Sequence, residues 1–125
     1  MEGINSPDVI QNNGWMYEGD WLKDHKHGYG ILSKISKDGN IRKVYAGNWI
    51  EGKKHGFGSN WYRDESYYEG TFQENKRNGY GRIWYKCGSR YYQGTWSNDR
   101  YHGEGIFIQG TRETFKYDFA KNKFA

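Results

Sequence analysis

The stretch YEGDWLKDHKHGYG, residues 17–30, carries the pattern that decides the fold. Its first half alternates Tyr17, Gly19 and Trp21 with polar or aliphatic residues, and a period of two residues is the signature of a β-strand. The polar residues 23–26 then lead into a second alternating segment that contains Gly-Tyr-Gly. Two alternating segments joined by a short polar stretch predict a β-hairpin.

A loop at this polar stretch sets rings and glycines of the two strands on one face. The expected pairs are Trp21 with Gly28, Gly19 with Gly30, and Tyr17 with Leu32. A glycine opposite a ring leaves room for the ring to lie flat across the strand and to cover its backbone. Glycine is otherwise a poor strand residue, so the pattern predicts ring-on-glycine packing.

The same pattern recurs as YAGNWIEGKKHGFG, YEGTFQENKRNGYG and YQGTWSNDRYHGEG. Self-similarity at a period of about 20–50 residues indicates a repeat array. We expect a lead-in or partial preceding repeat at 1–13 and four repeats within 14–114, followed by a degenerate, truncated fifth copy at 115–125. The four repeats are expected at about 17–44, 45–67, 68–91 and 92–114. The repeat glycines are Gly19, Gly28, Gly30, Gly47, Gly56, Gly58, Gly70, Gly79, Gly81, Gly94, Gly103 and Gly105.

The predicted fold is all-β: an elongated, twisted, single-layer antiparallel sheet of consecutive β-hairpins without an enclosed core. Each repeat adds two strands, so the array lengthens by roughly 10 Å per repeat, and each repeat is stabilised by its neighbours. The connection at 33–43 is the longest, and we expect its hairpin to protrude. A structural spine of rings replaces the core, formed by Tyr17, Trp21, Tyr45, Trp49, Tyr68, Phe72, Tyr92 and Trp96.

The composition is unlike that of a protein with an aliphatic core. Aromatic residues make up 19% of the 125 residues, whereas Leu22 and Leu32 are the only leucines and Val9 and Val44 the only valines. Cores are usually built from leucine, isoleucine and valine, so the rings must supply most of the buried apolar area. A low aliphatic content also occurs in disordered chains, but this many rings argues against disorder.

The charges and the single cysteine narrow the function classes. The net charge of +4 comes from basic and acidic residues interleaved along the chain, so no dense block predicts a nucleic-acid partner. Cys87 is the only cysteine, which excludes an internal disulfide and fits a reducing compartment; it is expected in a hairpin turn. The chain also lacks an apolar run of membrane-spanning length and a signal peptide. We expect a soluble, cytoplasmic protein.

The glycine and carboxylate motifs are better explained by the structure of the repeats than by nucleotide binding or catalysis. A nucleotide-binding loop needs a strand before its glycines and a helix after them, whereas each Gly-x-Gly here continues into strand. Glu18, Asp20 and Glu69 invite an acid–base reading, but carboxylates that recur from repeat to repeat are typical of cross-strand surface pairs. We therefore expect no catalytic residues, no cofactor and no enzymatic activity.

Histidines that precede a Gly-x-Gly suggest a row of metal ligands at His27, His55 and His102. Equivalent positions in neighbouring repeats are ~10 Å apart, while zinc holds imidazole nitrogens at about 2.0–2.1 Å. Histidines of different repeats therefore cannot share one ion, and we expect no metal site.

The strings YEGDW…HGYG, YAGNW…HGFG and YQGTW…HGEG resemble MORN (membrane occupation and recognition nexus) repeats. The resemblance covers residues 14–125, although the copy that starts at Phe115 departs from the motif. It implies a non-enzymatic scaffold. Proteins of this family act in cilia, flagella, sperm, the cytoskeleton and junctional membrane assemblies. Some bind peptides along the groove of the sheet, and some dimerise end to end.

Two candidate surfaces and two alternative functions follow from these interpretations. Rings that the spine does not need are candidates for a partner-binding groove, since aromatic side chains dominate protein recognition: Tyr29, Phe57, Tyr80, Trp61, Trp84 and Tyr85. An open sheet edge at the fifth copy predicts a homodimer or end contact through Phe115, Tyr117 and Phe119. The alternative functions are peripheral binding to anionic phospholipid membranes, suggested by the net charge, and glycan binding on exposed rings.

Overall fold

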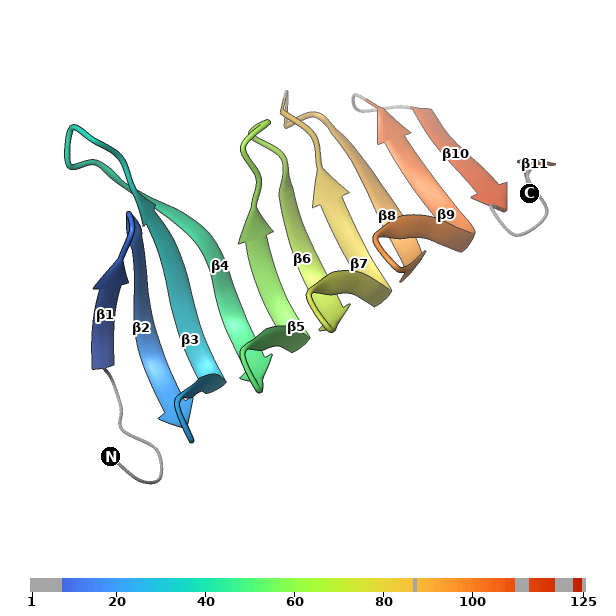
Figure 1. Ribbon diagram of the computed structural model, residues 1–125. Helices are drawn as coiled ribbons and strands as arrows, with labels where there is room; N and C mark the ends of the chain where they lie inside the picture. The colour runs from blue at the N-terminus through green and yellow to red at the C-terminus, as the bar shows by residue number, and fades with distance from the viewer. Residues whose placement is uncertain (1–7, 87, 110–112, 119–122, 125) are drawn as a thin grey trace.

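The computed structural model describes the backbone of residues 8–86, 88–109, 113–118 and 123–124, and the side chains of 13–86, 88–109 and Asp118. Within these residues, eleven strands follow one another along the chain (Figure 1). They are β1 (Asp8–Asn12), β2 (Trp15–Leu22), β3 (His25–Ile35), β4 (Ile41–Ile50), β5 (Lys53–Trp61), β6 (Tyr67–Gln73), β7 (Lys76–Trp84), β8 (Arg90–Ser97), β9 (Arg100–Gln109), β10 (Glu113–Asp118) and β11 (Lys123–Phe124).

The strands form one antiparallel sheet whose spatial order equals the chain order. Each of the strands β2 to β10 pairs with the strand before it and the strand after it, so the sheet is an open row of hairpins (Figure 1). The prediction of an all-β, single-layer array of consecutive hairpins is confirmed. Among the described residues there is no helix with the length and apolar character needed to cross a membrane.

Two-residue turns close the hairpins at one end of the sheet, where the sequence predicts a four-residue loop at 23–26. Lys23 and Asp24 have φ values of 51° and 67°, and positive φ at both central residues defines the type I′ turn, whose twist matches that of the flanking strands. The shorter turn lets residues 25 and 26 join the following strand. The equivalent turn pairs are Glu51–Gly52, Glu74–Asn75 and Asn98–Asp99.

The short turn changes part of the predicted register. Trp21 lies opposite Lys26, and the prediction that it faces Gly28 is wrong. Gly28 instead lies opposite Trp49 on β4, so this contact joins two repeats rather than the two strands of one hairpin. The remaining two pairs occur as predicted, Gly19 with Gly30 and Tyr17 with Leu32.

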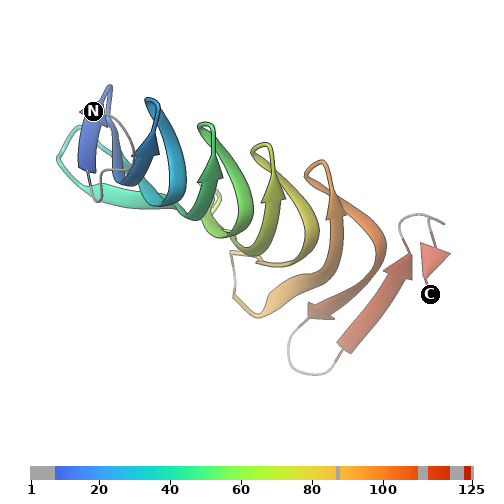
Figure 2. The ribbon, with the colours of Figure 1, turned by 90° about the horizontal axis from the view of Figure 1, so that it is seen from below.

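A bulge accounts for the difference in register. Residues 27–29 of β3 face the single residue Asp20 of β2, and extra residues on one strand bend it and increase its twist. Gly28 sits in the bulge with a φ of 72°, in the left-handed region that glycine enters without a steric penalty. Figure 2 shows the resulting curl of each hairpin. The equivalent glycines Gly56, Gly79 and Gly103 also have positive φ.

The leading tyrosine of each repeat covers a pair of glycines. A Cβ built on Gly30 would overlap the ring of Tyr17, and one built on Gly19 would meet the backbone of Gly30. The Tyr17 hydroxyl donates a hydrogen bond of 2.9 Å to the carbonyl of Asp20, which fixes the ring across both strands. Tyr45, Tyr68 and Tyr92 donate the same bond and are 0% exposed.

The spine continues from one repeat to the next through edge-to-face ring contacts. The Tyr17 and Trp49 ring centroids are 5.6 Å apart at 85°, and those of Tyr68 and Trp96 are 5.3 Å apart at 87°. The Trp49 indole N–H also donates to the carbonyl of Gly30 in the preceding repeat, at 3.1 Å. The single layer therefore has a continuous line of packed rings in place of an enclosed core.

Candidate partner-binding face

The two faces of the sheet differ sharply in what they bury. Seven of the eight predicted spine rings are 0–4% exposed, and Trp21 is partly buried against them. The opposite face carries the side chains that alternate with the spine, and we call it the outer face. The spine rings are buried, whereas the outer face carries the exposed rings Tyr29, Phe57 and Tyr80.

One row of the outer face exposes a large ring in each of the first three repeats. Tyr29, Phe57 and Tyr80 are 55%, 58% and 58% exposed, and each stands between the two glycines of its Gly-x-Gly. We call these three residues the exposed row. Their cross-strand partners are the small polar residues Asn48, Thr71 and Thr95, which leave the flanks of the rings open.

A second, half-buried row runs beside it nearer the other end of the strands. Trp61, Tyr67, Trp84 and Tyr91 pair in register across β5 to β8. Their successive ring centroids are 5.2, 5.4 and 6.1 Å apart. We call these four residues the aromatic ladder. It is a tilted stack of rings that is continuous from β5 to β8.

The aromatic ladder is only partly foreseen from the sequence. Trp61 and Trp84 are predicted partner-binding residues, and both lie in it. Tyr67 and Tyr91, which complete it, are missed. The signal for them is the doubled tyrosine at 67–68 and 91–92: consecutive strand residues point to opposite faces, so one ring of each pair must leave the spine.

Tyr85 lies apart from the other predicted partner-binding rings. It packs against the buried spine cluster, and its hydroxyl contacts that of Tyr101. Burial raises the pKa of Tyr85 well above its ordinary value, and the contact with Tyr101 raises it further. Tyr85 and Tyr101 also line a cavity of about 330 Å³ beside β8 and β9. Tyr85 is therefore a packing residue in this structure.

Polar side chains border the aromatic ladder and give it mixed character. The Arg82 guanidinium lies over the rings of Tyr91 and Trp84, at 4.6 and 5.3 Å from their centroids. The Tyr67 hydroxyl donates to a Glu69 carboxylate oxygen at 3.0 Å. Cation–π contact and hydrogen bonding hold the rings in fixed positions, so the outer face presents a preorganised surface.

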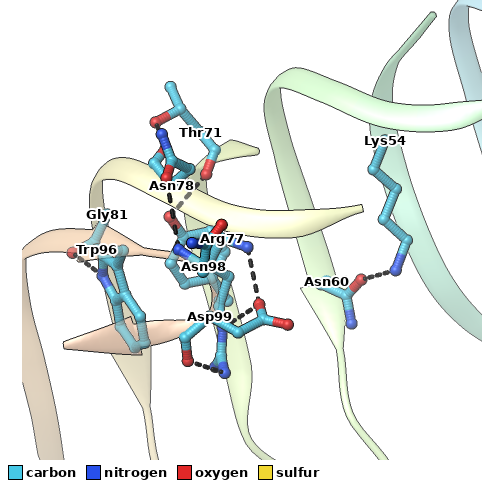
Figure 3. A network of polar contacts seen from close by, with 10 residues as sticks. Lys54, Asn60, Thr71, Arg77, Asn78, Gly81, Trp96, Asn98 and Asp99 are labelled. Carbon is cyan, nitrogen blue, oxygen red and sulfur yellow. Dashed lines mark hydrogen bonds and ion pairs between the residues drawn. The ribbon is translucent and has the colours of Figure 1, made fainter. Parts of the chain in front are cut away.

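Basic side chains pack over the spine rings, and this role could not be predicted from the sequence. Lys26, Lys54 and Arg77 occupy equivalent positions two or three residues after their turns, and each lies over spine rings at 4.6–6.0 Å. The Lys54 ammonium donates to Asn60 Oδ1 at 2.7 Å (Figure 3). Burial lowers the pKa of Lys54. These cations cover the rings and are part of the packing.

The turns bind the repeats together through the backbone of these cation positions. The amide N–H of Gly52 donates to the Lys26 carbonyl at 2.9 Å, and that of Asp99 donates to the Arg77 carbonyl at 3.0 Å. Asp99 Oδ1 in turn accepts from the Arg77 amide at 2.8 Å and from its Nε at 3.1 Å (Figure 3). The turns of the second, third and fourth repeats therefore hold the strand of the preceding repeat.

The residues weighed for catalysis or metal binding are dispersed. Among the side chains that the structure describes, no three His, Cys, Asp or Glu residues come together in a geometry for a metal ion. Asp20 accepts a hydrogen bond from the Tyr29 amide at 3.4 Å and so supports the bulge. Cys87 lies outside the described residues.

The predicted end contact is described only in its backbone. Phe115 and Tyr117 belong to β10, which pairs with β9 along six residues. Their side chains, and Phe119 as a whole, lie outside the described residues. The backbone of this region continues the sheet as β10 and β11.

The geometry defines a repeat protein: an open array of β-hairpins joined by ring-on-glycine packing, with one accessible aromatic face. A family model for the MORN repeat matches residues 17–39, 45–66, 68–90 and 92–111. The chain belongs to the MORN-repeat family. A search of curated proteins gives no match to the chain.

Proposed function

We propose that the chain is a non-enzymatic scaffold that binds a protein segment across its outer face. The observation that carries the proposal is the exposed row, in which Tyr29, Phe57 and Tyr80 are each more than half exposed and stand in equivalent positions. Rings at protein surfaces mark recognition sites when they gather in one region. The aromatic ladder widens this apolar region, and Arg82 and Glu69 give it a polar border.

The spacing of the exposed row fits a regular peptide. Equivalent rings lie two strands apart, which is roughly 10 Å at the usual strand spacing. An extended segment covers that length in about three residues, and a helix covers it in about seven residues, or two turns. Either form can present one apolar side chain to each ring. The rings are rigid, so ordering the face on binding loses little conformational entropy.

The cellular setting that we propose rests on resemblance. MORN-repeat proteins act as scaffolds in ciliary, flagellar and sperm cytoskeletal assemblies, and we propose an axonemal or cytoskeletal role here. The long connection at 33–43, the segment VYAGNW and the start YYEG also resemble MORN repeat-containing protein 3. This likeness supports the same setting.

A pull-down from ciliated-cell or testis extract tests the proposal. The Phe57→Ser and Tyr80→Ser double variant should fold, because both side chains are 58% exposed, and should recover several-fold less of any specific partner. The control is Ile41→Ser, which removes an apolar side chain of 59% exposure from the start of β4, outside the exposed row and the aromatic ladder. Equal recovery by wild type and double variant would place the binding surface elsewhere.

The C-terminal end of the array is the second contact that we propose. An open sheet edge invites pairing with another chain, and a second copy or another protein at β10 and β11 would cover it. Light scattering at high micromolar concentration tests for the dimer; a strictly monomeric mass would contradict it.

A further inference from the structure

A polar cavity of about 500 Å³ lies at the junction of the third and fourth repeats. It opens beside the β8–β9 turn, against the first residue of β7. Its lining combines two basic side chains with hydroxyl, amide and imidazole groups, from Lys76, Ser97, Asn98, Arg100, Tyr101 and His102. The volume falls within the range of about 300–1,000 Å³ that is usual for ligand cavities.

The preceding repeat junctions carry an acid where this one carries an amide. The first turn residue is Glu51 in the second repeat, Glu74 in the third and Asn98 in the fourth, with φ values of 50°, 48° and 50°. Glu74 pairs with Lys53 of the preceding repeat at 3.8 Å. Because Asn98 replaces this acid at the next junction, the equivalent lysine, Lys76, loses its carboxylate partner.

The replacement of glutamate by Asn98 leaves positive charge at this junction without a carboxylate to pair with it. None of the ion pairs among the described residues includes Lys76 or Arg100, and both are exposed. Asn98 is held in place by its amide N–H, which donates to Asn78 Oδ1 at 3.4 Å, and the two residues lie together in Figure 3. Donors from a lysine, an arginine, a serine and an amide around one cavity suit a multivalent anion.

We propose that this junction cavity binds the phosphate group of a phosphorylated serine or threonine in the protein partner. A phosphate ester brings a charge of about −1.5 to −2 and three acceptor oxygens, enough to satisfy Lys76 and Arg100 together. Recognition of phosphorylated segments by basic side chains is an established binding mode. The inference rests on the proposed protein-binding function and adds a requirement for phosphorylation.

The position of the cavity favours a peptide over a membrane. Tyr80 of the exposed row lies opposite Thr95, and Thr95 lies opposite His102 of the cavity lining. A segment laid along the exposed row therefore reaches the cavity after two strands, or roughly 10 Å. A flat lipid surface would also meet the exposed Glu104, two residues beyond His102, and two cations are fewer than the about 4–8 typical of lipid-binding clusters.

The substitution Asn98→Glu tests the proposal, because it restores the acid found at the two preceding junctions. Glu51 and Glu74 already occupy this turn position at the same φ, so the variant should fold, which circular dichroism and thermal melting check. The probe is a degenerate mixture of fluorescent peptides with a fixed central phosphoserine, compared with its unphosphorylated counterpart by anisotropy. Lys53→Gln, which alters a lysine already paired with Glu74, is the matched control.

Wild type and Lys53→Gln should bind the phosphorylated mixture at least about tenfold more tightly than the unphosphorylated one, as charge-assisted hydrogen bonds to a phosphate require. Asn98→Glu should abolish the preference, and Lys76→Gln with Arg100→Gln should do so without altering the turn. No preference in wild type, or a preference that survives these variants, would overturn the proposal. So would binding to phosphoinositide vesicles that Asn98→Glu abolishes, without binding to the phosphopeptides.

The extract experiment separates the two proposals. In one outcome the Phe57→Ser and Tyr80→Ser variant loses a partner, while Asn98→Glu and phosphatase treatment have no effect on its recovery. That outcome would support the protein-binding function and exclude the requirement for phosphorylation. Recovery that none of these changes lowers would remove the proposed function itself. Loss with Asn98→Glu and after phosphatase treatment is the result expected if the cavity reads a phosphate.

Discussion

At the scale of single residues, the glycine pairs carry the most stringent requirement. Gly19 and Gly30 face each other beneath the Tyr17 ring, and any Cβ there would overlap the ring or the opposite backbone. The tyrosine takes the space that two side chains would fill in an ordinary sheet. The ring and the glycines are therefore one packing unit distributed over two strands.

Substitution of Gly30 by alanine should lower the free energy of unfolding by about 2 kcal/mol or more, because the added methyl overpacks the site against a ring held by a hydrogen bond. Removing the ring first, with Tyr17→Ala, should make the same Gly30→Ala change much smaller. Urea denaturation of the four proteins in this double-mutant cycle measures the coupling. Additive effects would show that the clash is relieved elsewhere.

The buried tyrosines predict a loss of stability in alkali. Burial raises the pKa of Tyr92 from 10.0 to about 12, and burial raises those of Tyr45 and Tyr68 in the same direction. A raised pKa in the folded state means that the stabilisation is complete below pH 10 and is lost as the pH rises toward 12. Thermal melting across this range should show the fall, and ultraviolet absorbance should show these tyrosinates appearing with unfolding.

At the scale of elements, the turn of one repeat is hydrogen-bonded to a strand of the preceding repeat. Asp99 accepts hydrogen bonds from the Arg77 amide and Nε, and its own amide donates to the Arg77 carbonyl. Asn75 makes the same backbone exchange with Lys54, through its amide and its Oδ1. A two-residue turn thus closes its own hairpin and fixes the junction with the preceding repeat.

Asp99→Ala should destabilise the protein by about 1–3 kcal/mol, since it removes the acceptor of a backbone amide and a guanidinium. Asp24→Ala is the matched control, because Asp24 holds the same turn position with a φ of 67° against 68° for Asp99. The two variants share the backbone strain of alanine at positive φ, so their difference in chemical denaturation isolates the link. Equal effects would mean that the link adds nothing.

The hairpins could be predicted from the sequence because alternation and repeated glycines leave few other folds. The two-residue turns and the bulge could not be predicted from the sequence. Lys23 and Glu74 adopt positive φ values, and nothing in the identity of these polar residues indicates that conformation. The role of Lys54 could not be predicted either, because a lysine is usually a surface residue and only the fold shows that its ammonium group lies over the ring of Tyr45. The exposed row was foreseen because Phe57 has no role in ring-on-glycine packing.

At the scale of the whole molecule, stability should be graded along the array. Strands in the middle have a neighbour on each side and spine contacts in both directions, whereas β11 pairs with β10 through two residues in the part of the chain that the structure describes. In a nearly one-dimensional protein, local opening begins at the ends. Hydrogen exchange followed by mass spectrometry should find the slowest amides in β5 to β8 and faster exchange toward β1 and β10. Uniform protection would indicate a single cooperative unit.

The direction of the hydrogen bonds has a mechanical consequence. The strands lie across the array, so the bonds between them run along its length (Figure 1). A tensile load applied at the two ends would peel one strand at a time instead of shearing a whole sheet at once. Each junction held by a turn such as Asn98–Asp99 would then act as a separate stop, and the molecule would extend under force in steps of one repeat.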